Sequence, residues 1–131
     1  MSMHAIKTQD LTKRFRTGKS AEVTAVDAIS FTVAKGSVTG LLGGNGAGKT
    51  TTISMLLGLL LPTAGTIEVL GVDMVRYRHA VLPRMNFSSP YVELPHRLTV
   101  RENLTVYGHL YGLKGVKHRM EELAEHLDLT R

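Results

Sequence analysis

The alternation of apolar and polar residues predicts two strands at the start of the chain. Apolar positions recur loosely along Ala5–Phe15, and Val23–Val33 is rich in β-branched residues. Both patterns are typical of half-buried strands. The polar segment Arg16–Ser20 between them contains a glycine and has the composition of a turn. We therefore expect an antiparallel pair of strands.

The pattern then changes to short apolar runs and a helical segment. Val38–Leu42 is a short apolar run, and the glycine-rich segment Gly43–Gly48 follows it. Lys49–Leu61 has the composition of a helix and ends before a proline, which cannot continue a helix. Strand, glycine loop and helix begin a βαβ unit. Further short strands are expected at Thr66–Leu70 and Met85–Ser88.

The last third of the chain is predicted to form two helices. Thr99 and Glu102 have the spacing of a capping box, which would open a helix that runs to about Tyr111. A second helix carries its apolar residues on one face and its charged residues elsewhere. Its apolar positions are Val116, Met120, Leu123, Ala124 and Leu127. This amphipathic helix needs another element to cover its apolar face.

Composition narrows the class of protein. The chain has 131 residues, of which 43% are hydrophobic and 21% charged, as in a soluble globular domain rather than a fibre or a disordered tail. It has no cysteine and its six histidines lack metal-site spacing, so we expect neither disulfides nor a thiolate metal site. The longest apolar stretch, Met55–Leu61, is far shorter than the roughly 20 residues of a membrane span. The start, Met1–His4, lacks a secretory signal, and a cytoplasmic location is expected.

Positive charge is concentrated at the N-terminal end. The chain carries a net charge of +5, and residues 1–20 contribute five basic residues against one acidic residue. The basic residues are Lys7, Lys13, Arg14, Arg16 and Lys19. This edge could meet nucleic acid, an acidic lipid surface or nucleotide phosphates, and a solvated surface is the alternative.

The segment Gly43–Thr50 satisfies the pattern G-x-x-x-x-G-K-[ST] of a phosphate-binding loop. Its glycines allow successive backbone N–H groups to surround a phosphate, and the following helix adds the positive end of its dipole. Lys49 would meet the β- and γ-phosphates, and the Thr50 hydroxyl would bind Mg²⁺. The dinucleotide pattern G-x-G-x-x-G fails, because Lys49 or Thr51 occupies its last glycine position. The sequence therefore predicts a nucleoside triphosphate site.

The segment Leu41–Thr51 resembles the Walker A segment of ABC transporter ATPases, with Gly44 where the family usually has proline. Four flanking segments resemble, in chain order, the opening strand, the second strand, the segment after the P-loop helix and the helical subdomain of the exporter-type branch. They are Leu11–Phe15, Ala28–Val33, Leu61–Ile67 and Arg97–Leu104. The resemblance extends over nearly the whole chain.

The resemblance implies an α/β fold, that of a P-loop NTPase of the ABC ATPase type. Residues 1–36 would form its antiparallel β region, and residues 37–90 the P-loop core with the start of the parallel core sheet. Residues 91–131 would begin the helical subdomain. The domain would be incomplete, because the signature motif, the Walker B carboxylates and the switch histidine of the family would all lie beyond Arg131.

The resemblance also assigns site residues. Phe15 matches the aromatic residue that stacks on adenine, and a core phenylalanine is the alternative. The phosphate cradle and its flank would be Gly43, Gly44, Asn45, Gly46, Ala47, Gly48, Lys49, Thr50 and Thr51. Thr50 would ligate Mg²⁺, so that ATP and Mg²⁺ are the expected ligands. Where the family has a glutamine that contacts Mg²⁺ and water, this chain offers Ser88, Ser89 or Pro90, and its sole glutamine is Gln9.

The resemblance implies the ATP-binding subunit, in part, of an ABC transporter of the export type. Its partners would be a separate membrane permease and a second ATP-binding subunit, and it would lie in the cytoplasm on the inner face of the cell membrane. Nucleic acid is not an expected partner. Two alternatives are a soluble ABC-type ATPase that acts on nucleic acid or the ribosome, and a truncated nucleotide-binding fragment without activity. A polypeptide of these residues alone is expected not to hydrolyse ATP.

Overall fold

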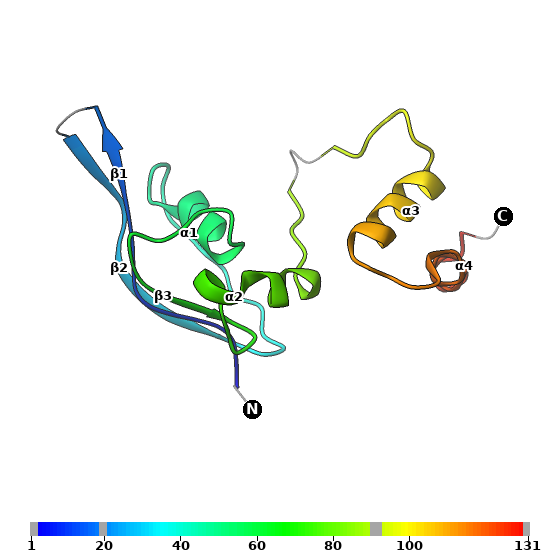
Figure 1. The fold of residues 1–131 in the computed structure, drawn as a ribbon, viewed down its shortest axis with the longest axis horizontal. Helices are drawn as coiled ribbons and strands as arrows, with labels where there is room; N and C mark the ends of the chain where they lie inside the picture. The colour runs from blue at the N-terminus through cyan, green and yellow to red at the C-terminus, as the bar shows by residue number, and fades with distance from the viewer. Residues whose placement is uncertain (1–2, 19–20, 90–92, 130–131) are drawn as a thin grey trace. The chain divides into compact units, whose positions relative to one another are not determined.

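The computed structural model describes residues 3–18, 21–89 and 93–129. Its contacts divide the chain into two compact units, residues 1–84 and residues 85–131 (Figure 1). The first unit contains an antiparallel sheet with two short helices, and the second contains a pair of helices.

Two long strands, β1 (His4–Thr17) and β2 (Ala21–Ala34), pair antiparallel and confirm the predicted pair. Strand β3 (Ala64–Val69) pairs antiparallel with β1, and β4 (Val72–Asp73) pairs with β3. The sheet order is therefore β2-β1-β3-β4. The strand expected at 66–70 is confirmed, although it begins two residues earlier.

One helix follows the glycine loop, and a second helix follows strand β4. Helix α1 (Lys49–Leu56) is shorter than the expected 49–61, because the chain turns at Gly58, where φ is 69°. Helix α2 (Met74–Val81) was not predicted; Asp73 caps it by accepting hydrogen bonds from the N–H groups of residues 75 and 76, and the 3-10 helix η1 (Leu82–Arg84) continues it.

The core of the first unit lies between the sheet and these helices. Leu11 and Ile67 come from the sheet, and Met55, Met74 and Val81 come from α1 and α2. All five side chains are at most 2% exposed. The helices therefore cover one face of the sheet (Figure 1), and burial of this apolar surface stabilises the unit.

Two expected strands are absent. Residues 37–44 are irregular, and Val38 and Leu42 are 102% and 93% exposed. A strand needs a neighbour for its backbone groups, and no described segment pairs with residues 38–42. Residues 85–88 are likewise irregular. The α/β class is confirmed, but within the described residues every strand pair is antiparallel, so the expected start of a parallel sheet is not found there.

The second unit contains both predicted helices, α3 (Val100–Leu110) and α4 (Val116–His126). The capping box is confirmed: Thr99 N donates to Glu102 Oε2 at 2.7 Å, and Glu102 N donates to Thr99 Oγ1 at 3.3 Å. The helices meet where Gly108 faces Val116, and an added Cβ on the glycine would lie 2.6 Å from Val116 Cγ1. No helix of the described ranges is long and apolar enough to cross a membrane.

Candidate phosphate-binding site

The glycine loop curls around the ammonium group of the lysine that follows it. Lys49 Nζ donates hydrogen bonds to the carbonyl oxygens of Gly43 and Gly44 at 2.6 and 2.7 Å. A further bond from Ala47 N to Gly44 O, at 3.2 Å, closes the turn. The ammonium therefore lies against the loop itself, where a phosphate held by the loop would meet it.

Gly48 anchors the loop to strand β2. Its φ is 81°, a left-handed conformation that favours glycine, and it is the N-cap of α1. An added Cβ would collide with the carbonyl oxygen of Ala25 and lie 3.2 Å from Val26 Cγ2. Any larger residue at this position would push the loop away from the strand.

Thr52, in helix α1, also holds Gly48 in place, and this role was not predicted from the sequence. The residue is 3% exposed, and its N–H and its hydroxyl both donate to Gly48 O, at 2.8 and 3.0 Å. A threonine one turn after the loop is the only signal the sequence offers for this role.

The N-terminus of α1 is open to an anion. No side chain caps it, and its first turn holds no acidic residue. The first N–H groups of a helix have no partner within the helix, and they carry the positive end of its dipole. Together with Lys49, they make this end of the helix attractive to phosphate oxygens.

The two threonines after the lysine differ in exposure. Thr50 is exposed and its hydroxyl makes no hydrogen bond within the described part of the chain, whereas Thr51 is half-buried. A free hydroxyl beside the phosphate-binding loop has the chemistry of a Mg²⁺ ligand, since Mg²⁺ prefers oxygen. Thr50 therefore fits the metal.

Phe15 lies on the same face of the β1–β2 ladder as the glycine loop. The residue is 41% exposed, so it is not a core residue. Lys13, two residues earlier on β1, places its Nζ 5.2 Å from the centroid of the Phe15 ring. Lys13 is also paired across the ladder with Val26, the residue that meets Gly48. Directly paired residues share a face of the sheet, so the ring and the loop lie on one side.

The expected glutamine-loop positions belong to the other unit. Ser88 is exposed and Ser89 is half-buried, both in the irregular segment that opens residues 85–131. Pro90 lies outside the described residues. Gln9 is in β1, where it lines a polar depression of about 240 Å³ on the sheet.

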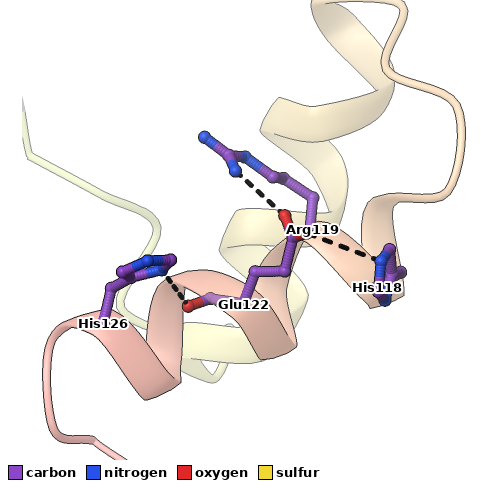
Figure 2. Close-up of polar contacts among 4 residues, drawn as sticks. All are labelled: His118, Arg119, Glu122 and His126. Atoms are coloured by element: carbon purple, nitrogen blue, oxygen red, sulfur yellow. Dashed lines mark hydrogen bonds and ion pairs between the residues drawn. The ribbon is translucent and has the colours of Figure 1, made fainter.

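The second unit also carries a polar cluster on α4 (Figure 2). Glu122 is 2.9 Å from Arg119 Nη1 and 3.5 Å from His118 Nε2, and its carbonyl oxygen is 2.8 Å from His126 Nδ1. The hydrogen bond from Arg119 lowers the pKa of the Glu122 carboxyl. No group of three or more acidic or histidine side chains suited to hold a metal ion exists among the described residues.

Comparison with known proteins gives one consistent result. The sequence profile described as "ABC transporter" matches residues 26–131. Nod factor export ATP-binding protein I of Ralstonia nicotianae is 38% identical over 122 residues, which cover 92% of this chain and 36% of that protein. Bacitracin transport ATP-binding protein BcrA of Bacillus licheniformis is 42% identical over 123 residues, which cover 92% of this chain and 37% of that protein.

A solved structure shows the same similarity at the level of the fold. The structure of an ATP-binding subunit of an ABC transporter matches with a TM-score of 0.71 at 27% identity. The match covers 88% of this chain and 46% of that one. The chain thus spans less than half the length of each of these three proteins.

Proposed function

The chain belongs to the ABC transporter family, and on this premise we propose that it forms the ATP-binding part of a transporter's ATPase subunit. The observation that carries the proposal is the glycine loop closed around the Lys49 ammonium at the open N-terminus of α1. Nucleoside triphosphates are the family's ligands. The N-terminus of α1 offers N–H donors to their phosphates, and Lys49 offers a cation.

In the proposed complex, the residues Gly43–Thr51 hold the triphosphate. Lys49 leaves the loop carbonyls and pairs with the β- and γ-phosphates, so that its neutral acceptors are replaced by negatively charged ones. The Thr50 hydroxyl would hold Mg²⁺, which would supply positive charge that neutralises these phosphates. Phe15 offers an aromatic face to adenine, and such stacking gives affinity with little selectivity among bases.

The same proposal covers the parts of the chain. Residues 1–36 serve as the antiparallel β region, which β3 and β4 extend, residues 37–90 as the P-loop core and residues 91–131 as the start of the helical subdomain. The glutamine of the family corresponds to Ser88, Ser89 or Pro90, and neither a serine nor a proline has the reach and the amide group of a glutamine side chain. Coupling between nucleotide and permease would therefore differ from that of relatives with glutamine.

The proposed partners follow from the family. We place the chain on the inner face of the cell membrane, against a separate permease and a second ATP-binding subunit. The two relatives named above carry "export" and "transport" in their names, which supports a transport role and, for the first, the export direction. ATP hydrolysis by the complete subunit would drive transport.

Calorimetric titration of MgATP into the full chain and its Lys49→Ala variant tests this function. We expect the variant to lose binding, because the cation that faces the phosphates is gone. Lys7→Ala is the matched control, since it removes the same charge from strand β1 and should bind like the wild type. Equal affinity of wild type and Lys49→Ala would refute the site.

A second variant tests the adenine end. Phe15→Ala should weaken ATP by about 1–2 kcal/mol, the scale of base stacking on an aromatic ring. Phe15→Tyr keeps the ring and should be nearly neutral. Unchanged ATP affinity in Phe15→Ala would remove this residue from the site.

A further inference from the structure

We infer that Lys13 is a positioning residue of the nucleotide site. Its side chain orients the Phe15 ring and connects strand β1, which carries this ring, to Leu61 in the segment after helix α1. The inference rests on the proposed ATP-binding function and adds a residue to it. Lys13 does not contact the phosphates in this account; it acts through Phe15.

A single ammonium makes both contacts. Lys13 Nζ donates to Leu61 O at 2.9 Å and lies 5.2 Å from the centroid of the Phe15 ring. A cation at this distance over an aromatic face is attracted by the quadrupole of the ring. Because the ammonium takes one face of the ring, the other face is left for a base, and the exposure of Phe15 (41%) agrees with an accessible ring.

The hydrogen bond to Leu61 is one of several between the same two segments. Thr63 N donates to Thr12 O at 2.8 Å, and Arg14 N donates to Thr63 Oγ1 at 3.0 Å. The Thr63 hydroxyl in turn lies 3.4 Å from Arg14 O. Residues 12–14 of β1 are thereby fastened to residues 61–63 through backbone and side chain.

This fastening connects the two ends of the proposed site. Residues 61–63 follow α1, and α1 begins at Lys49 beside the glycine loop. The phosphate loop is itself anchored to the ladder through Gly48 and Val26, the cross-strand partner of Lys13. The spacing between the stacking ring and the phosphate cradle is therefore fixed before ligand arrives, which lowers the entropic cost of binding a ligand that must reach both.

Titrations with two ligands separate positioning from general effects. Full-chain wild type and variants are titrated with MgATP and, separately, with magnesium tripolyphosphate, which has the phosphates but no base. We expect Lys13→Met to weaken ATP about two- to fivefold, the scale of an exposed cation–π contact. Tripolyphosphate affinity should stay unchanged, because Lys13 does not meet the phosphates.

Three further variants identify the cause. Lys13→Arg keeps the cation over the ring and should match the wild type. Lys13→Gln has an uncharged N–H donor on a side chain one bond shorter, and should lose ATP affinity as Lys13→Met does. Lys7→Met removes an exposed charge from the same strand, without a contact to Phe15 or Leu61, and should leave both ligands unaffected.

A double-mutant cycle completes the test. In a Phe15→Ala background, Lys13→Met should cause no further loss of ATP affinity, because its action passes through the ring. Wild-type affinity of both uncharged Lys13 variants, or equal losses for ATP and tripolyphosphate, would overturn the role of Lys13 while the ATP site stands. A wild type that binds neither ligand would instead refute the proposed function, and this inference with it.

Discussion

The two units differ in how many apolar side chains they bury. Of the nine apolar side chains that are buried among the described residues, eight belong to the first unit and only Val116 to the second. The eight are Leu11, Val26, Met55, Leu56, Ile67, Val69, Met74 and Val81. Close packing of buried side chains is concentrated in the unit that carries the glycine loop.

The helical unit buries few apolar side chains, and local hydrogen bonds hold the start of its first helix. The Asn103 amide donates to the carbonyl oxygens of Pro95, Leu98 and Thr99 at 3.1–3.3 Å, which holds the chain entering α3. Apolar side chains of this unit stay exposed: Leu110 of α3 is 74% exposed, and Leu127, the residue that follows α4, is 65% exposed. The candidate site and the larger core therefore occur in the same unit, whereas α3 and α4 keep exposed apolar side chains among the described residues.

The largest expected effect lies in the core of the first unit. Leu11→Ala should lower its free energy of unfolding by about 2–5 kcal/mol, because the substitution leaves a cavity at a fully buried position. Urea unfolding followed by the β-sheet signal in circular dichroism measures it. Leu59→Ala, at a residue 78% exposed, is the control and should change stability by less than about 0.5 kcal/mol. Similar effects of the two substitutions would contradict the described core.

A smaller effect is expected at the start of α3. Thr99→Ala removes the side-chain cap and should destabilise the helix by about 1 kcal/mol. Hydrogen exchange of the α3 amides reports it, and the exchange of β1 amides should not change. Thr99→Ser keeps the hydroxyl and should behave like the wild type. Loss of protection in β1 as well as in α3 would show that the effect of the substitution is not local to the cap.

The smallest effect is a pH dependence in the same cap. Hydrogen bonds from the Thr99 N–H and hydroxyl lower the pKa of the Glu102 carboxyl. A lowered pKa means that ionised Glu102 stabilises the folded helix at neutral pH, and that this contribution is lost as pH falls below the usual carboxyl range. Helical circular dichroism should therefore decrease slightly on acidification, and less so in Glu102→Gln. An equal decrease in the variant would assign the change to other groups.

Most elements could be predicted because their signals are local. Alternation predicted β1 and β2, and the Thr99–Glu102 spacing predicted the start of α3. The apolar run 38–42 was wrongly predicted as a strand, since strand formation depends on a partner that a run of apolar residues does not specify. Helix α2 was missed because it is short, although its cap, Asp73, is a recognisable signal.

Only part of the candidate site could be predicted from the sequence. The loop Gly43–Thr50 could be predicted because the residues of its pattern are consecutive in the chain. The contacts that anchor it are not, because Gly48 meets Ala25 and Lys13 meets Leu61 across long stretches of sequence. Such partners depend on the register of β1 with β2 on one side and with β3 on the other, and both registers include irregularities that sequence alternation does not reveal.

Hydrogen exchange measured by mass spectrometry, with and without MgATP, tests most directly whether the first unit holds the nucleotide. The account predicts that ATP slows exchange of residues 43–52 and of residues 12–15, while the helices α3 and α4 exchange as before. The Lys49→Ala variant should show no such slowing at the same ATP concentration. Protection confined to α3 and α4, with residues 43–52 unchanged, would contradict a nucleotide site built on the first unit.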